Sequence, residues 1–149
     1  MVVRSVSELM AAIGGITEVA LEQAKTPTLD VVKKNVDEHV YGAGTPVEYG
    51  RTGNLRDSLD VERTGMILEI AHRDTAFYPS ALGGGSGLST KGLAQVVHNT
   101  GAPDVFGGSS TTFWQKPRPY MDRARDELAA YKFKELLADG IRAQGFKVR

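Results

Sequence analysis

The stretch LDVERTGMILEIA, residues 59–71, decides the fold class because its side chains alternate in character instead of following a helical period. Apolar Leu59 and Val61 alternate with acidic Asp60 and Glu62, and a second alternating run follows. Successive side chains of a β-strand point to opposite faces, so this alternation predicts two strands. The strands meet around Thr64-Gly65, which predicts an antiparallel hairpin.

A long helical region is expected before the hairpin, because apolar side chains recur at helical spacing over residues 6–41. Ser5 or Ser7 is placed to cap it. Thr26-Pro27 has the form of a cap followed by proline at the first helical position, so the region is expected to be kinked or broken there. The pair Gly14-Gly15 costs about 2 kcal/mol of helix propensity relative to alanine. This cost predicts support from packing, or a place where another backbone comes close.

After the hairpin, residues 93–98 and 111–114 are expected to form further strands. A last helix is expected to begin at Pro119 and to end at Gly140 or Gly145. The predicted fold is therefore α+β: a long N-terminal helical region and a C-terminal helix packed on a small antiparallel sheet, with a mobile Gly-rich loop. All 149 residues fit a single domain, residues 1–149.

The glycine-rich segment, residues 80–92, is the flexible insert of this domain. Five of the ten residues from 83 to 92 are glycine. Ordering ten such residues would cost about 10 to 20 kcal/mol, and few side chains are available to offset this cost. We expect the segment to be mobile in the isolated chain and to become ordered against neighbouring subunits.

Composition excludes several classes of protein. The chain contains no cysteine, which excludes disulfides, zinc–thiolate sites and thiol nucleophiles and favours assembly in a reducing cytoplasm. Its 18 basic and 18 acidic residues balance, so tight DNA binding by the free subunit is not expected. Polar residues interrupt the N-terminal apolar run, so neither a signal peptide nor a membrane span is predicted.

No pattern of an enzyme, a metal site or a cofactor site is found. Lys91 lacks the spacing of a phosphate-binding loop, and no G-x-S-x-G element is present. The three histidines, His39, His72 and His98, do not form a metal-binding spacing. The expected roles are a helix-surface residue for His39, a strand end for His72 and the start of a turn for His98.

A nucleic-acid groove is an alternative use of the arginines near the hairpin, which are Arg51, Arg56, Arg63 and Arg73. Carboxylates such as Asp60 and Glu62 are interleaved with these arginines. Mixed charge of this kind is more typical of a soluble surface or a protein interface. Phe113, Trp114 and Tyr120 form an aromatic corner that serves either as the lid of the core or as an anchor in a partner's pocket.

Three separated pieces carry a resemblance to a known family. YGRTGNLRDSL, residues 49–59, is similar to the TG-x-L-x-x-S element of the tail-completion, or head-to-tail joining (neck), proteins of long-tailed bacteriophages. Residues 96–101 lie where that family has an apolar stretch that ends in a turn. Residues 116–121 resemble its proline-rich segment before the last helix. The resemblance spans residues 6–140.

The resemblance implies a structural virion protein, not an enzyme, without cofactor or metal. It implies a homo-oligomeric ring, of six subunits, at the head–tail junction, assembled in the host cytoplasm. The implied partners are the connector or stopper and the tail tube or tail terminator proteins, with DNA passing through the lumen without sequence-specific binding and no membrane. A tail terminator that caps the tube, or a nucleic-acid-binding accessory module, are the alternative functions.

The predicted interface residues are Arg51, Thr52, Gly53, Asn54, Arg56, Gly83, Gly84, Gly85, Trp114, Pro117, Arg118, Pro119 and Tyr120. Within this set, Thr52 is expected to cap a short helix, and Arg51 and Arg56 to face outward toward acidic groups of an adjacent chain. Leu55 and Leu59 are expected to point inward. The alternative is a capped turn within one subunit that has no interface role.

Overall fold

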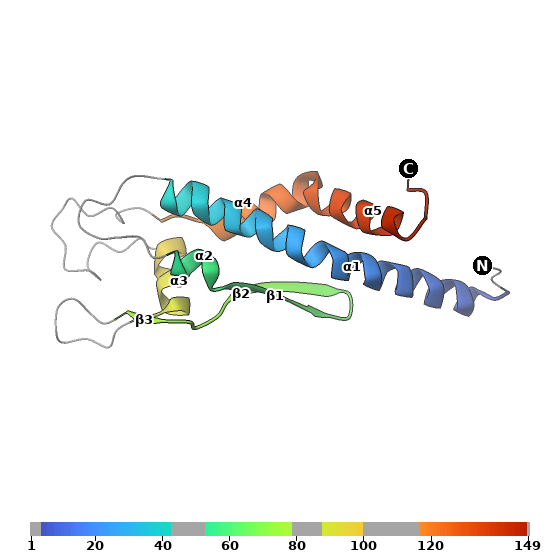
Figure 1. Cartoon of the computed structure of the whole chain (residues 1–149), viewed down its shortest axis with the longest axis horizontal. Helices are drawn as coiled ribbons and strands as arrows, with labels where there is room; N and C mark the ends of the chain where they lie inside the picture. The colour runs from blue at the N-terminus through green and yellow to red at the C-terminus, as the bar shows by residue number, and fades with distance from the viewer. Residues whose placement is uncertain (1–3, 43–52, 79–87, 100–116, 149) are drawn as a thin grey trace.

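The computed structural model describes residues 4–42, 53–78, 88–99 and 117–148 of the chain. A long helix α1 (Val6–Val36) lies between a β-hairpin and the C-terminal helical segment (Figure 1). The hairpin consists of β1 (Leu59–Thr64) and β2 (Ile67–His72), and the C-terminal segment of α4 (Tyr120–Glu127), the π-helical turn η2 (Leu128–Lys132) and α5 (Phe133–Ala143). The predicted α+β class is confirmed.

Helix α1 begins where the sequence predicts. Ser5 is the N-cap residue, and its side-chain oxygen accepts a hydrogen bond from the Glu8 backbone N–H at 3.2 Å. The Glu8 carboxylate accepts one from the Arg4 backbone N–H at 2.8 Å, so each side chain satisfies a free donor of the first turn. The π-helical turn η1 (Asp37–Tyr41) continues α1 and ends at Gly42.

The predicted break at Pro27 is wrong, because α1 runs through this residue and Thr26 is not an N-cap. Proline inside a helix removes one backbone hydrogen bond and costs about 3 kcal/mol. The neighbouring side chains Ala24, Thr28 and Val31 are all buried. Burial of this face on both sides of Pro27 offsets the local cost and holds the helix continuous.

The glycine pair of α1 has no neighbour among the described atoms. A Cβ added at Gly14 or at Gly15 would meet none of them within 4 Å. No backbone of the described chain therefore approaches this point. In contrast, a Cβ on Gly140 of α5 would lie 2.8 Å from the Ala20 Cα, so a glycine is required where α5 crosses α1.

The predicted hairpin is confirmed. Leu59 pairs with His72 and Thr64 with Ile67, and the strands are antiparallel. The turn contains Gly65 at φ +58, a left-handed conformation that favours glycine. A second pair of short strands, β3 (Phe77–Tyr78) and β4 (Leu88–Ser89), forms a separate two-stranded sheet.

The predicted strand over residues 93–98 is wrong, because these residues belong to helix α3 (Thr90–Asn99). The Ser89 side chain accepts a hydrogen bond from the Gly92 backbone N–H at 3.2 Å, as an N-cap residue does. Ala94 and Val97 are buried on one side of this helix. A short apolar run without a clear period does not distinguish a strand from a helix, and the packing of Ala94 and Val97 into the core favours the helix here. The strand predicted at 111–114, and residues 80–87 of the glycine-rich insert, lie outside the described residues. The remaining residues of the predicted insert, 88–92, form β4 and the start of α3 and are not a loop.

The C-terminal helix begins after Pro119, as predicted, and ends before Gly145, which has φ +87. Gly140 lies inside α5 and does not end it. The main core forms where η1, the short helix α2 (Asn54–Asp57), α3 and α4 meet. Its buried residues are Val32, Val36, Val40, Leu55, Leu59, Ala94, Val97, Tyr120 and Ala124.

Candidate functional site

The family-like element forms a tight junction, the α2 junction (residues 53–58), between η1 and the hairpin. Gly53 occupies the N-cap position of α2 at φ +77, without a side-chain cap bond. Thr52, which is expected to cap this helix through its hydroxyl, lies outside the described residues. Leu55 and Leu59 are each 4% exposed and enter the core, as predicted. The Ser58 backbone N–H closes the turn on the Asn54 carbonyl at 2.9 Å.

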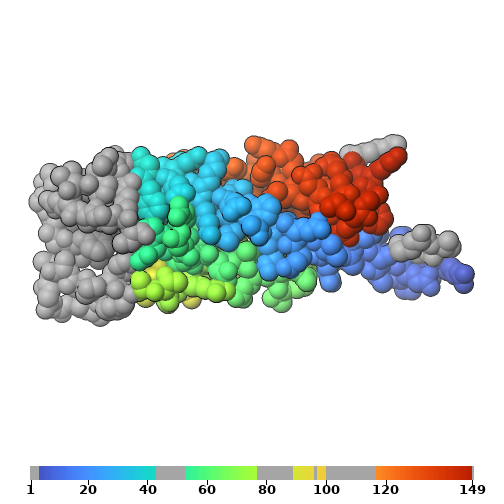
Figure 2. All heavy atoms as spheres, in the orientation of Figure 1, coloured from blue at the N-terminus to red at the C-terminus, as the bar shows by residue number. Residues whose placement is uncertain are grey.

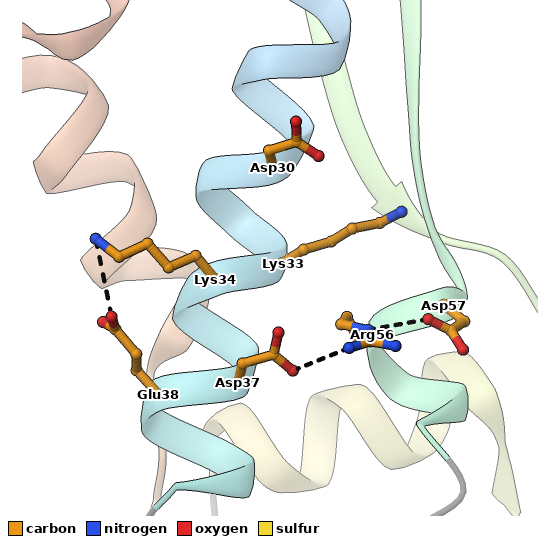
Figure 3. Close-up of a pocket in the computed structure, with 7 residues that line it drawn as sticks. All are labelled: Asp30, Lys33, Lys34, Asp37, Glu38, Arg56 and Asp57. Carbon is orange, nitrogen blue, oxygen red and sulfur yellow. Dashed lines mark hydrogen bonds and ion pairs between the residues drawn. The ribbon is translucent and has the colours of Figure 1, made fainter.

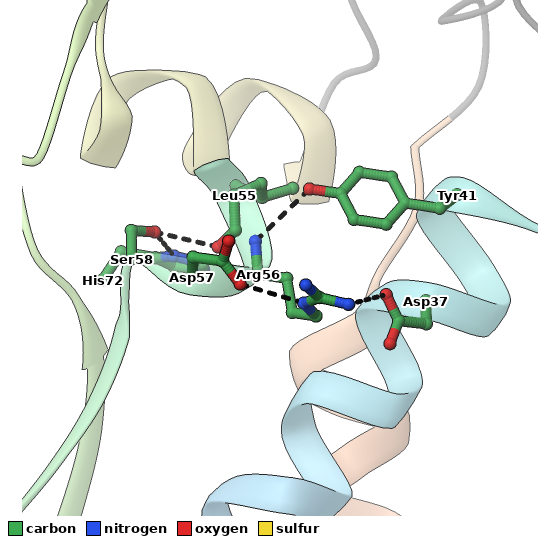
Figure 4. A network of polar contacts seen from close by, with 7 residues as sticks. All are labelled: Asp37, Tyr41, Leu55, Arg56, Asp57, Ser58 and His72. Carbon is green, nitrogen blue, oxygen red and sulfur yellow. Dashed lines mark hydrogen bonds and ion pairs between the residues drawn. The ribbon is translucent and has the colours of Figure 1, made fainter. Parts of the chain in front are cut away.

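Arg56 faces outward from this junction, yet it has partners in its own chain. Its guanidinium lies 3.0 Å from the Asp57 carboxylate and 3.5 Å from that of Asp37 on η1 (Figure 4). These contacts, with the Asp57 hydrogen bond first, raise the pKa of Arg56. The Arg56 backbone N–H donates to the Tyr41 hydroxyl at 3.3 Å. Pairing of Arg56 with acidic groups of an adjacent chain stays a prediction.

The surface around Arg56 is a shallow hollow of about 550 Å³ with mixed charge (Figure 3). Its lining residues are Asp30, Lys33, Lys34, Asp37, Glu38, Arg56 and Asp57. Four carboxylates face three cationic groups, so the hollow has no excess of positive charge for a phosphate or a nucleic-acid backbone. Lys34 also pairs with Glu38 at 3.9 Å and with Glu127 of α4 at 3.6 Å.

A buried chain of hydrogen bonds lies on the inner side of the junction. The Ser58 hydroxyl donates to the Leu55 carbonyl at 2.8 Å and lies 2.7 Å from His72 Nδ1. Because the only hydroxyl proton of Ser58 is donated to the Leu55 carbonyl, the Ser58 oxygen must accept a hydrogen bond from His72 Nδ1–H. The other ring nitrogen, Nε2, then accepts from the Tyr120 hydroxyl at 2.6 Å. The hydrogen bonds of this polar chain (Ser58, His72 and Tyr120) all run in one direction, from Tyr120 through His72 and Ser58 to the Leu55 carbonyl. This arrangement requires a neutral His72, because one ring nitrogen must accept a hydrogen bond.

Burial sets the protonation of these groups. It lowers the pKa of His72 to about 4, because the charged ring would lose its hydration without gaining a carboxylate partner. Burial likewise raises the pKa of Tyr120 well above its usual range. The His72 and Tyr120 rings meet edge to face at a centroid distance of 5.8 Å. The neutral forms therefore persist at neutral pH.

A serine and a histidine at hydrogen-bond distance also occur in hydrolases, but this pair is arranged differently. Ser58 and Tyr120 are 1% exposed and His72 is 9% exposed, so a substrate cannot reach the serine. The serine proton points to a backbone carbonyl and not to the histidine. The polar chain instead joins α2, β2 and α4. Sequence reasoning places His72 at a strand end, but its partners depend on tertiary contacts and leave no local signal.

The proline-rich segment approaches the same end of the molecule. The Arg118 guanidinium donates to the Val40 carbonyl of η1 at 2.8 Å, and its backbone N–H donates to the Val97 carbonyl of α3 at 2.9 Å. Pro119 occupies the N-cap position of α4. Of the two roles considered for Tyr120, the structure shows the lid of the core and not a surface anchor, because the side chain is enclosed. Pro117, in the same proline-rich segment, is exposed.

The predicted interface residues form three groups along the chain, within residues 51–56, 83–85 and 114–120. The fold brings the described members of the first and third groups together at η1. Arg56 contacts η1 through Asp37 and Tyr41, and Arg118 of the 117–120 segment donates to the Val40 carbonyl of η1. Gly53 and Asn54 lie next to Arg56 at the start of α2. Arg51, Thr52, Gly83, Gly84, Gly85 and Trp114 lie outside the described residues.

An open apolar groove of about 860 Å³ is a feature that sequence reasoning missed. Its walls are β2 and the C-terminal helical segment, with α1 between them. Contributing apolar residues include Val32, Ile67, Ile70, Leu128, Phe133 and Leu137. Its charged lining residues are Arg125 and Lys134. The apolar periodicity of each element is visible in the sequence, but not that the elements leave a space between them.

Comparisons with protein-family models, with curated proteins and with solved structures give no significant match. Among the described helices, none has both the length and the apolar character needed to cross a membrane. Within the same residues, no cluster of three or more histidine or carboxylate side chains is placed to hold a metal ion.

Proposed function

We propose that this chain is a structural subunit of a ring at the head–tail junction of a long-tailed bacteriophage, surrounding the DNA channel. The observation that carries the proposal is unpartnered apolar surface. Nine large apolar side chains of the described residues are exposed, several of them clustered at the N-terminal end of α1 and at the hairpin turn. Contiguous apolar surface on a soluble protein marks a site of interaction with another protein.

The order of elements supports the same proposal. A long N-terminal helix precedes the RTGNLRDS element, and a hairpin and a C-terminal helix follow it, which is the order that the family resemblance implies. The α2 junction and the proline-rich segment, which carry two pieces of the resemblance, both contact η1.

The described arginines of the alternative nucleic-acid groove, Arg56, Arg63 and Arg73, have carboxylate partners. Arg63 pairs with Glu22 at 3.0 Å, and Arg73 pairs with Asp60 and, at 3.7 Å, with Glu62. Cations that are already paired release few counterions on binding DNA, so they supply little affinity. This observation favours a ring through which DNA passes, rather than a module that binds DNA.

Deleting the gene from the phage genome that encodes the chain tests the proposal. We expect DNA-filled heads and separate tails by electron microscopy, with joined particles restored by the wild-type gene supplied in trans. A tagged copy should lie at the neck of purified particles. A tagged copy at the head-proximal end of free tails would instead indicate a tail terminator. Normal particles from the deletion, without the tagged protein in them, would refute the proposal.

A further inference from the structure

We infer that the N-terminal end of α1 in one copy docks into the apolar groove of a second copy, so that subunits associate head to tail. The docking segment is the α1 tip (residues 6–13). The inference deepens the proposed function and rests on it for the closure of the contacts into a ring.

The α1 tip extends past the C-terminal helix and the hairpin, so the other described elements do not cover it (Figures 1 and 2). Val6, Met10 and Ile13 are 78%, 66% and 50% exposed and share one helix face. Further along α1 the same face is buried at Ala20 and Ala24. The tip therefore presents the continuation of a core-forming face that lacks its partner.

The groove offers the matching surface. Helix α1 contributes only Thr28 and Val32 to the lining of the groove. The mouth of the groove is therefore open between β2 and the C-terminal segment. Ile67, at its edge, is 67% exposed. An amphipathic helix that places side chains at i, i+4 and i+7 into an apolar groove is a common mode of recognition.

Charge and backbone shape fit this pairing. Glu8 is the one charged residue of the α1 tip, and the charged residues that line the groove are the cations Arg125 and Lys134. Arg125 already pairs with Asp122 at 3.2 Å, so Lys134 is the cation that we expect to attract the tip. Gly14 and Gly15 follow the tip, and a Cβ added at either would meet no described atom beyond the adjacent helix backbone within 4 Å. A neighbouring backbone that approaches closely at this point would explain a glycine pair that weakens the helix.

A second copy is the occupant that satisfies both surfaces at once. The tip and the groove lie on different parts of the chain, so their contact is heterologous. Each subunit then uses its tip on one neighbour and its groove on the other, and such contacts produce a ring when the rotation closes. A tip-to-tip contact would leave the groove of each subunit open.

Paired charge-insertion variants test this contact. The tip variant Met10→Glu/Ile13→Glu and the groove variant Ile67→Glu/Ala129→Glu alter residues that are exposed in the subunit, so each is expected to fold. The matched controls are Ala11→Glu, on the opposite side of α1, and Ala71→Glu, on β2 outside the groove. Native mass spectrometry and analytical ultracentrifugation should show oligomers for wild type and controls. Association of each double variant should weaken by about 100-fold or more.

Mixing the two double variants distinguishes the head-to-tail contact from other contacts. The groove variant keeps an intact tip and the tip variant keeps an intact groove, so a mixture can form one contact and no further one. We expect a one-to-one dimer that does not grow with concentration. If the mixture stays monomeric while wild type assembles, the inference is wrong.

Cross-linking locates the contact directly, because the chain contains no cysteine. Single variants Ile13→Cys and Ala129→Cys, mixed and treated with a flexible bismaleimide, should form a 13–129 linkage between copies and little 13–13 linkage. If wild type assembles but the cysteine variants give only 13–13 linkages, the inference is overturned and the proposed ring still stands. A wild-type chain that stays monomeric also overturns it. The proposed function is judged separately, by the position of the tagged protein in particles.

Discussion

Lowering the pH should destabilise this protein through His72. In the folded state the ring is buried and its pKa is lowered from 6.5 to about 4, whereas in the unfolded chain it titrates near its usual value. Between these two values the unfolded state binds more protons than the folded state. Stability is therefore complete above about pH 6.5 and is lost as the pH falls toward 4.

The magnitude follows from the size of the shift. A pKa that falls from 6.5 to about 4 corresponds to about 3 kcal/mol in the free energy of unfolding. Between about pH 7.5 and pH 5, roughly 2 kcal/mol of this is lost. Urea unfolding followed by far-ultraviolet circular dichroism at a series of pH values measures the change.

A variant without the titrating ring isolates this contribution from those of carboxylates and of the other histidines. His72→Gln keeps a side-chain acceptor for the Tyr120 hydroxyl and does not titrate in this range. The stability difference between wild type and His72→Gln should shrink by roughly 2 kcal/mol between about pH 7.5 and pH 5. A difference that stays constant over that interval would refute the neutral, one-directional polar chain.

Three further changes test other parts of the fold. Tyr120→Phe removes the hydroxyl that donates to His72, and the unsatisfied Nε2 should cost about 1 to 3 kcal/mol of unfolding free energy in urea titrations at neutral pH. At a protein concentration where the subunit is monomeric, Gly140→Ala should destabilise by about 1 to 3 kcal/mol because its Cβ would meet Ala20, whereas the matched change Gly15→Ala, in open space within the subunit, should stabilise by about 1 kcal/mol; equal effects would contradict the close helix crossing. Ser89→Ala should lower the unfolding free energy by about 1 kcal/mol, because it removes the N-cap of α3, and Ser89→Asp should restore the cap. Hydrogen exchange of the first α3 turn should become faster only in the alanine variant.

Part of the candidate site was predictable because local signals carry it. Leu55 and Leu59 have the spacing of inward residues next to a turn, and both are in the core. The partners of Arg56 were not predictable, because Asp37 lies on an element that reaches it only after the chain has folded. The polar chain is similar. Ser58 and Tyr120 lie in two pieces of the family resemblance, but their hydrogen bonds to His72 form only when three elements come together.

The sequence by itself determined the hairpin, the extent of the N-terminal helical region, the Ser5 cap and the start of the C-terminal helix, because periodicity, caps and prolines act over a few neighbouring residues. Only the tertiary structure decided that α1 continues through Pro27, that residues 93–98 are helical, that Tyr120 is enclosed and that an apolar groove stays open beside α1. These features depend on burial between elements far apart in the chain. Such burial offsets a local preference, and no short window of sequence contains both partners of the contact.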